Sequence, residues 1–275
     1  MKPSNAITLL LALCLLPAAS TIAADTTIRV GGTGSSLSMM KILAAAYHES
    51  YPDMHVKVVP RLGSNGGMRA LLAKKIDIAI SALPLNKDAR KAGAVQDEYA
   101  RTPYTFTQHP DNPPLKSITT AQLANIFIGT TKNWTGGQVM RLVMRPLNDS
   151  DTLFMQNIAP EVNEAVKVAL TRKGIIMAPT DRDSADALES ISGAFGVSTL
   201  AQIKAEQRKL KPIALNGVMP SIQALESGQY KYYKSLSIVT RKNPDSATQR
   251  FIAYVRSQAG QQLLREYDHV VVPKQ

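Results

Sequence analysis

Short apolar strands alternate with amphipathic helices in the first third of the chain, and this alternation restricts the fold more than any other feature. "TTIRVGG" (26–32), "HVKVVP" (55–60) and "IDIAISAL" (76–83) have the pattern of strands. A helix is predicted over 36–51, and a loop followed by a helix over 64–75. Such units build parallel sheets with right-handed crossovers. The sequence therefore predicts an α/β fold that starts β-α-β-α-β.

Two loops rich in glycine and serine lie where these strands end. They read "GTGSSL" (32–37) and "GSNGG" (63–67). Taken singly, each is most simply a tight turn. In parallel sheets, however, ligands bind beyond the carboxyl ends of the strands, and glycine lets backbone N–H groups approach an anion closely. The pairing of the two loops therefore favours an anion site.

The rest of the chain continues the alternation. A short helix capped by Thr119 or Thr120 is expected to end at Phe127, and a strand over 138–147 leads through "NDSDT" into another helix. One amphipathic helix is expected within 246–273, followed by a final strand. The sequence has no internal repeat and no low-complexity linker, so no flexible tether is predicted between domains.

The first 24 residues have the layout of a secretory signal peptide, with Lys2, an apolar run and small residues before the cleavage site. Cys14, the single cysteine of the chain, lies in this segment, so the mature protein is expected to lack cysteine ligands and nucleophiles. The formal net charge is +11, but no basic run exceeds "KK" and no aromatic residues are interleaved with it. This pattern predicts a solvated basic surface and argues against a nucleic-acid partner.

Catalytic and metal-binding patterns are missing from the sequence. The four histidines (His48, His55, His109 and His269) lack metal-ligand spacing, and no nucleophile motif or paired carboxylates are evident. We therefore expect no metal, no cofactor and no enzymatic activity. Asp181 and Asp183 in "TDRDS", like Arg61 and Arg69 beside the second loop, are interpreted as solvated side chains.

Several segments together resemble the phosphate-type periplasmic binding proteins, the type II solute receptors of ABC importers. They are the two glycine–serine loops, "DIAISALPL" (77–85), "LANIFIGTTKNW" (123–134), "SGAFGVSTL" (192–200) and the closing "RFIAYVRSQAGQQLL" with "VVVP". The order and spacing of these segments carry the resemblance, which spans nearly the whole mature chain.

The resemblance implies two lobes, each a mixed, mostly parallel sheet flanked by helices, with a ligand cleft between them. Residues 25–102 and 234–275 would form one lobe, and 103–233 the other. The protein would be a periplasmic monomer that captures a small oxyanion, phosphate or phosphate-like, and delivers it to an ABC permease in the inner membrane. Closure of the hinge on the ligand would be part of the observed affinity.

The same resemblance implies the site residues. Ser36 and Leu37 match the first anion-binding loop, and Ser64 matches the second. Arg145 matches the arginine that grips a tetrahedral oxyanion with two parallel hydrogen bonds. Residues of the loop that follows the arginine complete the set: Ser150, Asp151 and Thr152.

Two positions depart from the family pattern. Phosphate receptors normally have an aspartate after the serine of "DIAIS", where it accepts the proton of the phosphate; here Ala82 follows Ser81. Asp151 replaces a small glycine. Its carboxylate could turn into the cleft and accept a ligand proton, or it could cap the helix that begins at "TLFMQ". These departures keep open an alternative function, that of a sensor or accessory interaction protein without a transport role.

Overall fold

The structure, a computed structural model, describes residues 26–274. The predicted signal peptide, with Cys14, lies outside the described residues. Eleven strands join in one continuous mixed sheet, in the order β2-β1-β3-β10-β4-β8-β6-β7, with three short strands attached beside this path. The strands are β1 (Thr26–Gly32), β2 (Met54–Val59), β3 (Ile78–Ser81), β4 (Val95–Gln108), β5 (Ser117–Ile118), β6 (Arg141–Met144), β7 (Ile176–Met177), β8 (Ala194–Thr199), β9 (Lys211–Leu215), β10 (Tyr233–Thr240) and β11 (Val270–Val271).

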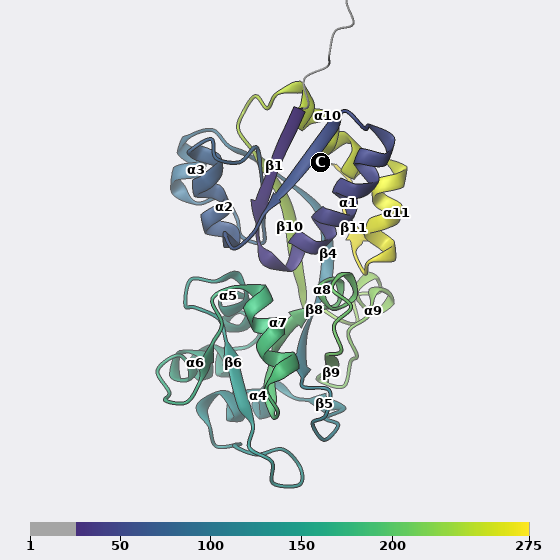
Figure 1. Ribbon diagram of the computed structural model, residues 1–275. Coiled ribbons are helices and arrows are strands. Elements are labelled where there is room, and N and C mark those ends of the chain that lie inside the picture. The colour runs from purple at the N-terminus through teal and green to yellow at the C-terminus, as the bar shows by residue number, and fades with distance from the viewer. Residues whose placement is uncertain (1–25, 275) are drawn as a thin grey trace, which may run out of the picture.

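Helices cover both halves of this sheet (Figure 1). A 3₁₀ turn, η1 (Gly34–Ser36), precedes the first helix. The helices are α1 (Leu37–Ser50), α2 (Gly63–Leu72), α3 (Lys87–Lys91), α4 (Thr120–Ile128), α5 (Ser150–Gln156), α6 (Pro160–Ala169), α7 (Asp181–Ser190), α8 (Leu200–Ala205), α9 (Ile222–Glu226), α10 (Ser246–Arg256) and α11 (Gln258–Glu266).

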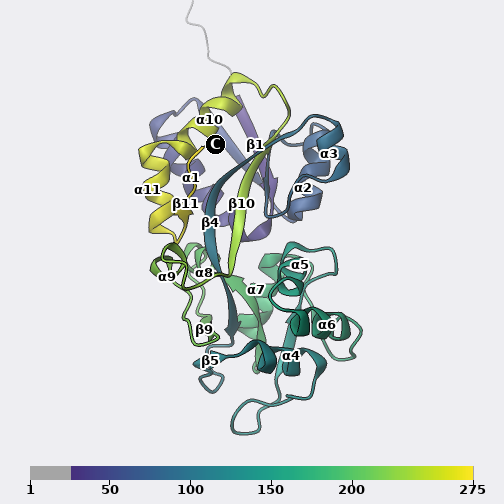
Figure 2. The ribbon, with the colours of Figure 1, turned by 180° about the vertical axis from the view of Figure 1, so that it is seen from behind.

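The molecule has two lobes, and β4 and β10 run along the connection between them (Figure 2). The first part of β4 pairs antiparallel with β10, and from Tyr104 onward β4 pairs with β8. Because β4 changes partners next to Pro103, we propose the lobe boundaries that the sequence predicts, near 102 and near 234. The upper lobe in Figure 1 is called lobe 1 below, and the lower one lobe 2.

The predicted parallel β-α-β-α-β unit is present in lobe 1, where β1 pairs parallel with β2 and with β3. Lobe 2 also contains a group of parallel strands, in which β6 pairs parallel with β7 and with β8. The antiparallel strands β10 and β4 lie between these two parallel groups. The α/β, two-lobed fold class is thereby confirmed.

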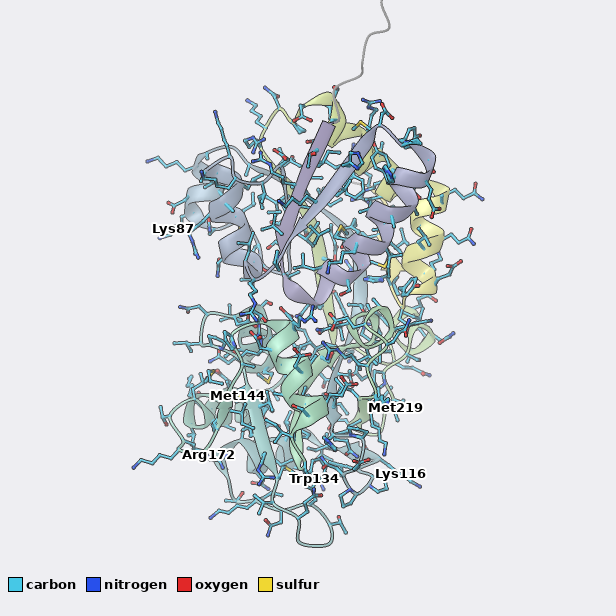
Figure 3. All side chains as sticks on the ribbon, viewed as in Figure 1. Lys87, Lys116, Trp134, Met144, Arg172 and Met219 are labelled. Atoms are coloured by element: carbon cyan, nitrogen blue, oxygen red, sulfur yellow. The ribbon has the colours of Figure 1, made fainter. Side chains whose placement is uncertain are left out.

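Each lobe has its own apolar core. In lobe 1, Ile28 and Ile80 of the sheet pack with Leu43 of α1 and Phe251 of α10. In lobe 2, Phe106 stacks on Phe195 with ring centroids 5.9 Å apart. Figure 3 shows side chains throughout both lobes, with Lys87 labelled in lobe 1 and Lys116, Trp134, Met144, Arg172 and Met219 in lobe 2. The apolar clusters of the described residues each lie within one lobe.

Two expectations about helices are wrong. The C-terminal amphipathic segment forms two helices, since Ser257 adopts an extended conformation (φ −69°, ψ 166°) and its side chain accepts a hydrogen bond from the N–H of Gly260 at the start of α11. The segment "TDRDS" is not a solvated loop but the first turn of α7. Thr180 caps it, with its side chain accepting from the N–H of Asp183. Within residues 26–274, no helix is both long and apolar enough to cross a membrane.

Candidate functional site

A cleft of about 1080 Å³ lies between the lobes. Its walls are loops that follow strands, as expected for a sheet of this kind. Lobe 1 contributes Gly34, residues 63–66 in the first turn of α2, and residues 83–86 after β3. Lobe 2 contributes Arg145 and the residues that lead to α5, together with 179–182 at the start of α7. Both glycine–serine segments predicted as an anion site therefore face one cavity. The second of them, 63–67, is not a loop as predicted but the start of α2.

The lobes already touch each other around this cleft. Asn65 of lobe 1 donates a side-chain hydrogen bond to the carbonyl of Asn148 of lobe 2 (3.4 Å). Arg61 pairs with Asp183 (3.1 Å), although the Arg61 side chain stays 70% exposed. Ser38 donates to Glu206 (3.1 Å). The conformation is therefore one in which the two walls meet.

Four of the seven predicted site residues line the cleft: Leu37, Ser64, Arg145 and Ser150. The hydroxyl oxygen of Ser64 accepts from the N–H of Ala82 (3.0 Å), so its own proton is directed elsewhere. The Ser150 hydroxyl is engaged by none of the side chains or backbone groups in the described part of the chain. These two hydroxyls are donors available to a ligand.

The structure places Ser36 and Thr152 behind the cleft wall. The Ser36 hydroxyl lies 3.0 Å from the hydroxyl of Tyr99 and is fully buried. The Thr152 hydroxyl donates to the backbone carbonyl of Arg145 (2.9 Å). Both side chains therefore hold the loops in place, and their predicted direct contact with a ligand has no geometric support in this conformation.

Asp151 adopts neither of the two orientations considered. The cap of α5 is Asp149, whose carboxylate accepts from the N–H of Asp151 (2.9 Å), so the capping prediction for Asp151 is wrong. Asp151 lies in the first turn of α5, is buried, and does not line the cleft. Its carboxylate instead forms an ion pair with Lys234.

Arg145 lies at the cleft wall with its guanidinium already engaged. It donates to both carboxylate oxygens of Asp149, at 3.2 Å from Nε and 2.8 Å from Nη2. Nη1 donates to the carbonyl of Ala178 (2.8 Å), and Nη2 also contacts Asp181 (3.4 Å). The side chain is only 1% exposed. The predicted anion-gripping residue is therefore in place, but with carboxylates of the chain itself as partners.

Asp181 reaches across the cleft to lobe 1. Its Oδ2 accepts a hydrogen bond from the backbone N–H of Gly34 in η1 (2.9 Å). Its Oδ1 lies 3.2 Å from the ammonium of Lys234, on β10. Lys234 also contacts the hydroxyl of Ser35 (3.3 Å). A buried network of charges therefore joins both lobes and the strand that connects them.

This buried network contains two cations, Arg145 and Lys234, and three carboxylates, those of Asp149, Asp151 and Asp181. Burial would raise the pKa of Asp181, but Lys234 and Arg145 outweigh that effect and hold it at about 2. Burial raises the pKa of Asp151 to about 6, even with Lys234 beside it. Burial would lower the pKa of Lys234, but the carboxylates of Asp151 and Asp181 raise it. Asp181 and Lys234 are therefore charged at neutral pH.

Asp181 and Lys234 were not predicted from the sequence as members of the site. A signal for Asp181 was present: Thr180 stands three residues before Asp183, a capping-box spacing that predicts a helix start. For Lys234 the signal was a single lysine at the start of the strand-like "SLSIVTR", where a buried charge needs a partner. Neither pattern identifies the partner across the cleft.

A metal is not favoured by the geometry. Within residues 26–274, no group of three or more histidine, cysteine, aspartate or glutamate side chains is arranged to hold an ion. The three carboxylates of the buried network face Arg145 and Lys234, whose charges already neutralise most of theirs. What the arrangement can do chemically is exchange one anionic partner of these cations for another.

Comparison with known proteins is consistent with this architecture. The phosphate-binding protein PstS of Borreliella burgdorferi is 25% identical over 211 residues, which cover 74% of this chain and 75% of that protein. The protein SphX of Synechococcus elongatus is 27% identical, over 78% of this chain and 68% of SphX. An ABC-transporter substrate-binding protein of Clostridium perfringens, solved with bound phosphate, shares the fold with a TM-score of 0.77 at 18% identity, over 90% of this chain and all of that one.

The family model described as the PBP superfamily domain matches residues 17–259, which is most of the chain. This match confirms the resemblance drawn from the glycine–serine loops and the segments that follow them. The chain therefore belongs to the PBP superfamily, the periplasmic binding proteins that its motifs resemble.

Proposed function

We propose that the protein is an exported solute-binding protein that captures a phosphate-like oxyanion in the cleft between its lobes for an ABC importer. The observation that carries the proposal is the position of Arg145 in the same cleft as residues 63–66, the glycine- and serine-containing first turn of α2 in the other lobe. A guanidinium is suited to tetrahedral oxyanions because it offers parallel N–H donors. The relatives named for phosphate binding support the same ligand class.

Donors from both lobes would hold the ligand. Ser64 offers its hydroxyl proton from lobe 1, and Ser150 offers its hydroxyl from lobe 2. Arg145 is a buried cation at the cleft wall. A ligand that contacts all three would favour the closed arrangement over an open one, which couples binding to hinge closure.

The cleft has room for more than inorganic phosphate. Its volume of about 1080 Å³ lies just above the range of roughly 300–1,000 Å³ that pockets for drug-sized ligands occupy. Apolar side chains, among them Leu62, Leu85 and Leu153, contribute to its walls. Phosphate monoesters therefore belong to the ligand class that we propose, beside phosphate itself.

Isothermal titration of the mature protein with phosphate, sulfate, molybdate and phosphate monoesters tests this function. We expect heat from phosphate or from a monoester, and weaker binding of each such anion by the Arg145→Lys variant, which keeps the charge but loses the planar fork. Absence of heat from every anion would contradict the proposal. The periplasmic location, the monomeric state and the permease partner belong to the same proposal, and co-purification with the membrane permease tests the last of them.

A second candidate is a family member without a transport role, acting as a sensor or accessory interaction protein. The observation that favours it is that Asp149 and Asp181 occupy the donors of Arg145 that a ligand would need. If this candidate is correct, the folded protein gives no heat with any oxyanion, and the neighbouring genes encode a kinase or a secretion component in place of a permease and an ATPase.

A further inference from the structure

The carboxylate of Asp181 lies among donors of the kind that hold an oxyanion. Its partners are a backbone N–H (Gly34, 2.9 Å), an ammonium (Lys234, 3.2 Å) and a guanidinium (Arg145, 3.4 Å). These partners come from η1 in lobe 1, from the connecting strand β10 and from the end of β6 in lobe 2. Asp181 itself is 4% exposed. A charge buried this deeply is retained only where such donors compensate its desolvation.

The backbone on the opposite wall is fitted to this carboxylate. A Cβ atom at position 34 would lie 2.7 Å from Oδ2 and 3.0 Å from Cβ of Asp181. The conformation of Gly34 is not one that excludes other residues, because its φ is not positive. Glycine at this position therefore serves the close approach of Asp181 and not a turn.

We propose that Asp181 acts as an internal anion: its carboxylate occupies the position of a ligand oxyanion, holds the lobes together without ligand, and must be displaced before a ligand can reach Lys234 and the N–H of Gly34. Asp181 is thus a residue that sets the affinity of the cleft. The ligand part of this inference rests on the proposed function, whereas the effect on the lobes does not.

The test compares Asp181→Asn and Asp181→Ala with the wild type. The first substitution keeps the size of the side chain and removes its charge; the second removes the contact. Asp186→Asn is the matched control, because Asp186 lies on the same helix, is exposed and pairs only within lobe 2, with Arg182 and Arg208. Isothermal titration with inorganic phosphate measures affinity, and X-ray scattering of the ligand-free proteins measures the radius of gyration.

We expect both Asp181 variants to bind phosphate at least tenfold more tightly than the wild type and the control, since a negative charge at the site is removed and Lys234 is released. We expect ligand-free Asp181→Ala to have a larger radius of gyration than the wild type. Gly34→Ala, which crowds the same contact from lobe 1, should also expand the ligand-free protein.

Equal phosphate affinities in wild type and variants would overturn the inference and leave the proposed function standing. If none of the proteins binds phosphate or any other oxyanion, the proposed function fails, and the scattering decides the inference alone. Unchanged radii in both Asp181→Ala and Gly34→Ala would then overturn it.

Discussion

Lys234, at the start of the strand that returns to lobe 1, forms a buried ion pair with Asp151, in the first turn of α5 in lobe 2. The two side chains are 3% and 5% exposed. A buried pair of this kind contributes little net stability when intact, but the loss of one partner leaves the other charge buried without compensation. The pair therefore makes the connection between the lobes sensitive to single substitutions.

Lys234→Met is expected to lower the free energy of unfolding by about 3–5 kcal/mol, because it leaves the buried carboxylates of Asp151 and Asp181 without their ammonium partner. Lys204→Met is the control: Lys204 also pairs with an aspartate, Asp268, but the two side chains are 49% and 29% exposed. Its loss should cost less than about 1 kcal/mol. Urea unfolding of the two variants measures the difference, and equal losses would mean that Lys234 is not buried as described.

The two neighbouring glycines of α2 should respond to alanine in opposite directions. A Cβ at Gly67 would lie 2.9 Å from the Cα of Gly32 on β1, whereas at Gly66 the nearest atoms lie at 3.6 and 3.7 Å. Gly67→Ala is expected to cost about 1–3 kcal/mol by overpacking the contact of α2 with the sheet. Gly66→Ala is expected to gain about 0.4–1 kcal/mol, since alanine loses less backbone freedom in a helix. Chemical denaturation checks both values, and a loss of stability in both variants would contradict the packing argument.

The burial of His269 leads us to expect a loss of stability on acidification. It is fully buried, and its Nδ1 donates to the carbonyl of Leu264 (3.1 Å). Burial lowers the pKa of His269 from an ordinary 6.5 to about 4. Between these values the unfolded chain binds a proton that the folded protein does not, so stability falls as the pH drops from 6.5 towards 4. The contribution is about 3 kcal/mol.

In His269→Gln this dependence should disappear, whatever the stability of the variant at neutral pH. Unfolding free energies measured from pH 7 to pH 4 give the pH dependence of stability for the wild type and for the variant. A variant that loses stability over this range as steeply as the wild type would show that other groups, and not His269, cause the dependence.

For Asp151 we expect the opposite dependence of stability on pH. Its pKa is raised from 3.8 to about 6, so between these values the folded protein binds a proton that the unfolded chain has released. The contribution of Asp151 to stability is therefore largest at low pH and falls as the pH rises from 4 to 6. We expect Asp151→Asn to lose stability more steeply than the wild type when acidified from pH 6 to pH 4. A slope unchanged from the wild type would mean that Asp151 remains ionised throughout.

Local pattern was sufficient for much of the fold. The β-α-β-α-β unit follows from strand and helix periodicity, and the cleft between strand-end loops follows from the topology of parallel sheets. The single strand β4, 14 residues long and shared by both lobes, was not predicted. Residues 102–108 of this strand are buried on both faces, yet they include polar side chains such as Thr105 and Thr107, which are usually exposed, so the sequence does not identify them as core.

For the candidate site, the sequence predicted only those residues whose position is set by their own local segment. Arg145 directly follows β6, and Ser64 lies at the start of α2, the helix after β2, so local pattern places both at the cleft. The contact of Asp181 with Gly34 joins residues 147 positions apart, and Lys234 meets Asp181 from a third segment. Such contacts depend on how the two lobes close on each other, which no local pattern encodes. The identity of the helix cap, Asp149 instead of Asp151, depends on a shift of two residues in where α5 starts.

If the proposed function is correct, Asp181 also determines the selection between phosphate and sulfate. Only phosphate carries a proton that an acceptor in the cleft can bind, and Ala82 supplies no acceptor. Asp151 does not line the cleft, whereas Asp181 does. A carboxylate displaced from Gly34 and Lys234 by the incoming oxyanion would be the nearest acceptor for the phosphate proton, and would face sulfate with no proton between them.

Leaving a buried acceptor without a donor costs about 1–3 kcal/mol, or roughly five- to 150-fold in affinity. Wild type is therefore expected to prefer phosphate over sulfate by a factor in this range, and Asp151→Asn should keep that preference at neutral pH. In Asp181→Asn the affinity for sulfate should rise more than that for phosphate, so that the ratio of the phosphate affinity to the sulfate affinity approaches one. Competition titrations of the two anions measure the ratio. If Asp151→Asn abolishes the preference while Asp181→Asn retains it, the proton acceptor is Asp151, and the oxyanion binds deeper than the cleft wall formed by Arg145.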